Sequence, residues 1–94
     1  MVRRGLGLMG RRGWTRSDAL LLPHCNSVHS FFMRMPIDLA YLNKQGQVVR
    51  MRHDLKPWRI GPIDFKADAV LELPAGALAR SSTEVGDRLV VEAA

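Results

Sequence analysis

Cysteine is almost absent from this sequence, and long apolar runs are missing altogether. The single cysteine, Cys25, excludes an internal disulfide and a cysteine-rich zinc site. The longest uninterrupted apolar runs have four residues, at positions 19–22 and 39–42. A membrane-spanning helix needs about 20 such residues, and a secretion signal needs at least about 7. We therefore expect a soluble, cytoplasmic protein without a membrane span.

The chain also lacks internal repeats, low-complexity blocks and Gly/Ser linkers. Its 94 residues suffice for one small core, and its 47% hydrophobic content supports such a core. We therefore expect a single domain over residues 1–94.

An excess of positive charge is present, but only near the start of the chain. Five arginines precede the first acid, Asp18, and residues 17–94 carry nine basic and nine acidic residues. We interpret residues 1–16 as a basic segment that is mobile or forms a short helix. Such an arm can bind a phosphate backbone, whereas the alternative is that its arginines only face water. Because no RRM, KH or helix-turn-helix signature accompanies the arm, nucleic-acid binding is kept as an alternative only.

Alternation of apolar and polar residues predicts a β-hairpin. Residues 37–42 and 47–55 alternate on either side of a turn at 43–46, where Gly46 can adopt a positive φ. Further strands are expected at 19–22, 28–33, 67–73 and 88–92, with a short helix at 75–80. Two prolines and a glycine predict a loop at 56–62. The pattern predicts a compact β-rich fold of about five or more short strands with one or two short helices.

Residues 25–38, CNSVHSFFMRMPID, resemble the signature of the bacterial and archaeal family called domain of unknown function 192. Segments 7–11, 69–76 and 85–88 are similar to further parts of the same family, in the same order. The resemblance implies an α+β, β-rich fold with a small, mixed, barrel-like sheet. It implies no reaction, because the family has no established activity. Longer members often carry export leaders and have an Asn where this chain has Met35, so an exported location is not carried over.

The densest polar cluster lies in residues 24–30. The candidate ligand-binding residues are Asn26, His29, Ser30, Arg34 and Asp38. An arginine fork beside polar side chains suits a carboxylate or phosphate group. The alternative is that Arg34 and Asp38 only form an ion pair across the bend at Pro36. We predict a non-catalytic binding module that takes a small polar or acidic ligand, or a protein partner, through residues 26–38. Trp58 is interpreted as packing over the core or at the mouth of this groove.

Catalysis by His29 with Cys25 or Asp38 is the alternative function. A thiolate activated by an imidazole is a common nucleophile. On an extended strand, however, Cys25 and His29 would lie about 13 Å apart, and a strand is predicted for most of this segment. No HxH, HxxxH or HExxH spacing is present. We therefore expect no metal site and no cofactor.

Overall fold

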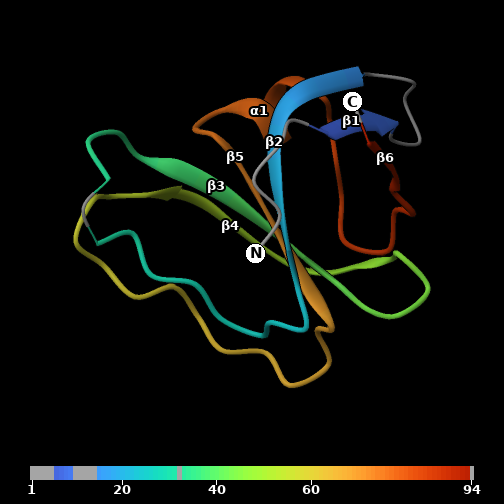
Figure 1. Cartoon of the computed structure of the whole chain (residues 1–94), viewed down its shortest axis with the longest axis horizontal. Coiled ribbons are helices and arrows are strands. Elements are labelled where there is room, and N and C mark those ends of the chain that lie inside the picture. Colours follow the sequence, from blue (N-terminus) through green and yellow to red (C-terminus); the bar gives the residue numbers. More distant parts are fainter. Residues whose placement is uncertain (1–5, 10–14, 32, 94) are drawn as a thin grey trace.

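The computed structural model describes residues 6–9, 15–31 and 33–93 of the chain. The fold is β-rich and contains one short helix (Figure 1). The elements, in chain order, are β1 (Leu6–Met9), β2 (Thr15–Pro23), β3 (Ile37–Leu42), β4 (Val48–Leu55), β5 (Ala69–Pro74), α1 (Ala77–Arg80) and β6 (Val90–Ala93).

The strands form one antiparallel sheet in the order β4-β3-β5-β2-β1-β6. The expected mixed, barrel-like sheet is therefore wrong on two points, since every described pairing is antiparallel and the sheet does not close. Its ends approach each other just before β6, where Gln47 and Arg88 form a single bridge and Leu89 N–H donates to the Gly46 carbonyl at 2.9 Å. This contact ends at Leu89, just before β6 begins at Val90, and no ladder joins β4 to β6 within the described ranges.

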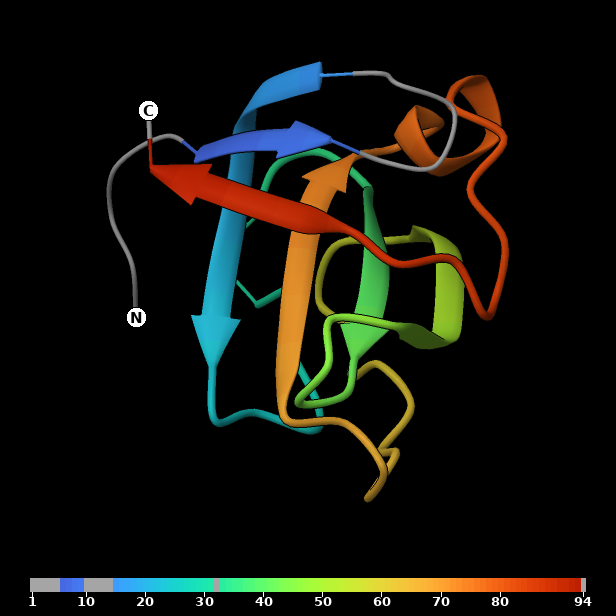
Figure 2. The same cartoon turned by 90° about the vertical axis from the view of Figure 1, so that its right-hand side faces the viewer.

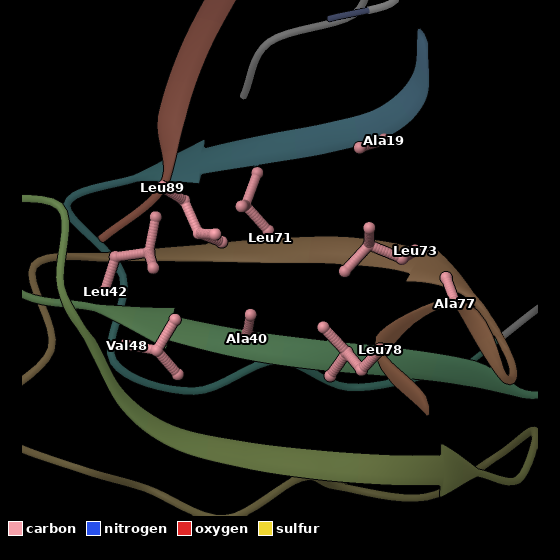
Figure 3. Packing of buried hydrophobic residues seen from close by; sticks show 9 residues of the cluster. All are labelled: Ala19, Ala40, Leu42, Val48, Leu71, Leu73, Ala77, Leu78 and Leu89. Atoms are coloured by element: carbon pink, nitrogen blue, oxygen red, sulfur yellow. The ribbon is translucent and has the colours of Figure 1, made fainter. Parts of the chain in front are cut away.

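One face of the sheet holds the larger hydrophobic core. Successive strand residues point to opposite faces, so Ala40 and Leu71 share a face that α1 and the segment before β6 cover (Figure 3). Leu78 of α1 is fully buried there. The buried members are Ala19, Ala40, Leu42, Val48, Leu71, Leu73, Ala77, Leu78 and Leu89.

The opposite face is covered by two loops, one made of residues 24–31 and 33–36 and the other of residues 56–68, which we call the paired loops. They run side by side along this face (Figure 1). β1 and β6 lie at the other end of the sheet (Figure 2). Under the paired loops lies a second core made of Leu22, Val28, Leu39, Tyr41, Leu55 and Val70.

The local predictions have mixed outcomes. The hairpin at 37–55 is confirmed as β3 and β4, and the loop at 56–62, the short helix and the strands near 19–22, 67–73 and 88–92 are confirmed with shifted ends. The strand predicted at 28–33 is wrong. The described residues 28–31 and 33 are loop, in which His29 forms an isolated bridge with Ile60.

The basic segment also differs from expectation at the residues that can be described. Leu6–Met9 is a strand and no helix, because its backbone pairs with β2 on one side and β6 on the other. Arg16 belongs to β2, whereas Arg3, Arg4, Arg11 and Arg12 lie outside the described residues. Within the described ranges, no helix has the length and apolar character needed to cross a bilayer.

Candidate functional site

The paired loops are tied together by backbone hydrogen bonds. Gly61 N–H donates to the Val28 carbonyl at 2.7 Å, and Asp64 N–H donates to the Asn26 carbonyl at 3.0 Å. Ser27 Oγ adds a bond to the Gly61 carbonyl at 3.2 Å. These bonds fix the loops as one layer over the second core, so their side chains occupy defined positions.

Ser30 is one of the residues that hold this layer in place. Its side chain is fully buried. Ser30 Oγ donates to the Lys56 carbonyl at 2.5 Å and accepts a bond from Arg59 N–H at 2.9 Å. These contacts give Ser30 a structural role in place of the predicted ligand contact.

Asp38 is likewise internal. It has no exposed surface, and its carboxylate accepts bonds from the N–H groups of Asp54 at 2.9 Å and of Gly76 and Leu78 at 3.1 Å each. The ion pair predicted between Asp38 and Arg34 is not formed, and Arg34 is exposed. Asp38 cannot reach Arg34 at the surface because it lies on the inner face of β3 with Ala40 and Leu42.

An aromatic row lies on the outside of the paired loops. The ring of His29 lies 4.9 Å from that of Phe31, and Phe31 stacks on Trp58 at 5.8 Å between centroids. Trp58 is 55% exposed, so it does not pack over the core, and the alternative position at the mouth of the groove stays a prediction. Exposed apolar side chains continue along the same loops: Phe31, Met35, Trp58, Ile60, Ile63 and Phe65.

A cleft of about 520 Å³ opens between β2, β5 and the first of the paired loops. Its lining is mainly apolar and comprises Leu20, Leu22, Cys25, Ser27, Val28, His29, Phe31, Met33 and Glu72. A hollow of about 560 Å³ at the turn 84–88 is lined, among the described residues, by those five consecutive residues. In the part of the chain that the structure describes, no second element contributes to that hollow, whereas three elements line the cleft.

Glu72 is the functional candidate that the sequence interpretation missed. It lies in the middle of β5, opposite Leu20 of β2 and Leu39 of β3, and is only 8% exposed. Its carboxyl group accepts no hydrogen bond from any described residue and forms no salt bridge with one. Burial raises the pKa of Glu72, and the charge of nearby His29 opposes this in part. A charged residue within the apolar run AVLELP was the signal that could have revealed it.

We expect Glu72→Gln to make the fold more stable near neutral pH, by about 1 kcal/mol. Because the pKa is raised in the folded state, ionising Glu72 disfavours the fold, and wild-type stability falls as the pH rises above the ordinary value of 4.5. Below that pH both side chains are neutral, so the difference should vanish. Urea unfolding of both proteins at acidic and neutral pH measures it. A difference that does not depend on pH would contradict the assignment.

Cys25 and His29 line the same cleft, although they were expected to be separated on an extended strand. No hydrogen bond between their side chains occurs among the described residues, and His29 Nδ1 accepts a bond from Phe31 N–H at 3.3 Å. In the same part of the chain, no group of three His, Cys, Asp or Glu residues is placed to hold a metal ion. The ligand-contact roles of Asn26, His29 and Arg34 stay predictions.

Comparison with known sequences finds one family. The profile of domain of unknown function 192, described as Uncharacterized ACR, matches residues 2–91. A UPF0127 protein of Pyrococcus furiosus is 44% identical over 63 residues, which cover 67% of this chain and 53% of that protein. A UPF0127 protein of Pyrococcus horikoshii is 34% identical over 92 residues, covering 94% and 78%. The match therefore spans little more than half of the P. furiosus protein.

Two solved structures share the fold. A protein of unknown function from Novosphingobium aromaticivorans superposes with a TM-score of 0.76 at 16% identity, over 92% of this chain and 83% of that one. A candidate transcription regulator from Sinorhizobium meliloti superposes with a TM-score of 0.73 at 18% identity, over 97% of each chain. At these identities the likeness concerns the fold alone.

Proposed function

This chain belongs to the domain of unknown function 192 family, and we propose that it is a non-catalytic binding module whose ligand occupies the cleft beside the paired loops. The observation that carries this proposal is the position of Glu72. Its carboxyl group is largely removed from water, faces the cleft and accepts no hydrogen bond from a described residue, and such partial burial of a charge is costly for a fold. Such exceptions concentrate at functional sites, where a ligand supplies what the fold omits.

The shape of the cleft supports the same function. Its volume of about 520 Å³ lies within the usual range for small-molecule sites. Apolar walls can bury most of a ligand, while Glu72 and His29 can orient it. The hydrogen bonds between the paired loops fix the position of Phe31, so little ordering is needed on binding.

A neutral aromatic compound, 2-phenylethanol, tests whether the cleft binds ligands. We expect it to shift the backbone amide signals of Leu22, Val28 and Glu72 in a saturable manner. Phe31→Ala removes one aromatic wall and should weaken binding about fivefold, a loss of about 1 kcal/mol. The matched control is Val85→Ala, because Val85 is an exposed apolar residue outside the cleft. Shifts that do not saturate, or equal affinities for the two variants, would contradict the proposal.

An enzyme that uses Cys25 is the second candidate, because Cys25, His29 and Glu72 line one cleft. A nucleophilic cysteine would react with iodoacetamide at a rate that rises at a pH well below the ordinary thiol pKa. His29→Ala should then slow the reaction. A thiol that reacts like free cysteine in both proteins would exclude this candidate. The version with Asp38 is set aside, since that carboxylate is enclosed by backbone donors away from the cleft.

A further inference from the structure

We propose that the ligand of the cleft is an organic cation, an ammonium group on an apolar or aromatic body, with Glu72 as its counter-ion. This inference rests on the proposed function and specifies the ligand's chemistry. It reverses the expectation of an acidic ligand, which was based on Arg34. That residue does not line the cleft.

The charge of the lining is the first reason. Among the described residues that line the cleft, Glu72 is the only acid, and there is no lysine or arginine. A carboxylate in a poorly solvated cleft attracts a cation strongly and repels an anion. Among the described residues no lysine or arginine pairs with Glu72, and the charge of His29 opposes the effect of burial only in part, so the ligand is the group that can supply a full counter-ion.

The remaining walls select an organic cation over a metal ion. Calcium and magnesium need several oxygen ligands, and Glu72 is the single carboxylate that the described lining offers. Leu20, Leu22 and Met33 instead offer apolar surface to a hydrocarbon body. Phe31 adds an aromatic ring, which attracts an ammonium group through its face.

Three compounds of similar size test the charge preference: 2-phenylethylamine, 2-phenylethanol and 3-phenylpropionate. Their dissociation constants at neutral pH follow from amide chemical shifts of the 15N-labelled full chain. We expect wild type to bind the amine about tenfold more tightly than the alcohol, because a charged hydrogen bond that contributes about 1.4 kcal/mol corresponds to a tenfold change in the dissociation constant. The carboxylate should bind most weakly.

Glu72→Gln keeps the shape of the side chain and removes its charge, so it should abolish the preference while binding of the alcohol is retained. Asp68→Asn is the matched control, because Asp68 is an acid outside this cleft. This variant should keep the full preference. A wild type that binds amine and alcohol equally, or a Glu72→Gln protein that still prefers the amine, would overturn the inference. If none of the three compounds binds the cleft, the proposed function itself fails.

Discussion

Asp38→Ala is expected to lower the free energy of unfolding by roughly 3–5 kcal/mol. The carboxylate of Asp38 accepts three backbone bonds in the interior, and each buried donor left without an acceptor costs about 1–3 kcal/mol. Asp54 and Gly76, two of the donors, have positive φ angles of 55° and 90°. Asp38 therefore stabilises a left-handed residue in β4 and another at the start of α1. Urea unfolding monitored by circular dichroism measures the loss.

Asp38→Asn and Asp68→Ala separate this role from a general effect of charge. The amide oxygen of an asparagine can still accept from Gly76 and Leu78, but its NH₂ group cannot accept from Asp54. Asp38→Asn should therefore cost less than Asp38→Ala and clearly more than Asp68→Ala. The side chain of Asp68 is 36% exposed, and its removal should change stability by less than about 0.5 kcal/mol. Equal losses for Asp38→Ala and Asp68→Ala would contradict the structural role.

The features that the sequence predicts well are those set by neighbouring residues. The hairpin of β3 and β4 follows from alternation and from a turn that Asn43 and Gly46 close with local bonds. The loop at 56–62 follows from its prolines. In these places the interactions that decide the structure lie within a few residues along the chain, so local preference and the final fold agree.

The features that the sequence does not predict depend on distant partners. Asp38 finds its donors 16 to 40 residues away, so nothing near it distinguishes a buried acceptor from a ligand contact. Residues 28–33 have aromatic and β-branched content typical of a strand. Their backbone nevertheless bonds to another loop, with Ser30 N–H donating to the Arg59 carbonyl at 2.8 Å. Tertiary contacts here override local preference.

The candidate site likewise contains residues that local sequence predicts and one that only distant contacts place there. His29 was predicted from its polar surroundings, and Cys25 was considered with it. Glu72 was missed because its position in the cleft depends on the register of β5 against β2 and β3. That register places an acid among leucines on the face that the paired loops only partly cover. The cleft is therefore a property of the sheet and the loops together.

Gly61→Val is the second substitution from which we expect a large loss of stability. A Cβ atom at Gly61 would lie 2.9 Å from Leu39 Cδ1, 3.1 Å from Tyr41 Oη and 3.1 Å from the Val28 carbonyl oxygen. Leu39 and Tyr41 are fully buried, so neither can move aside without disturbing the second core. Gly61→Ala should cost roughly 1–3 kcal/mol and Gly61→Val more, because each added methyl group increases the overpacking. Chemical denaturation of both variants measures the series.

Gly86→Ala separates steric crowding from backbone strain. Gly86 has a φ of 98° and nothing within 4 Å of an added Cβ, whereas crowding is the obstacle at Gly61. The strain of a left-handed alanine is about 1–2 kcal/mol, so Gly86→Ala should destabilise less than Gly61→Val. If the two substitutions cost the same, the close approach of the loop to the sheet would not be what requires a glycine at position 61.

Tyr41 provides an independent measure of what Gly61→Val does to the paired loops. It is the only tyrosine of the chain, and its hydroxyl donates to the Pro62 carbonyl beneath the second loop. Burial raises the pKa of Tyr41 above its ordinary value of 10.0, although the charge of Arg50 opposes the shift. If a valine at position 61 lifts the loop from the sheet, water reaches the phenol and the pKa should fall towards 10.0. Ultraviolet titration measures this fall, and an unchanged pKa would mean that the loop stays seated and the core absorbs the added methyl groups.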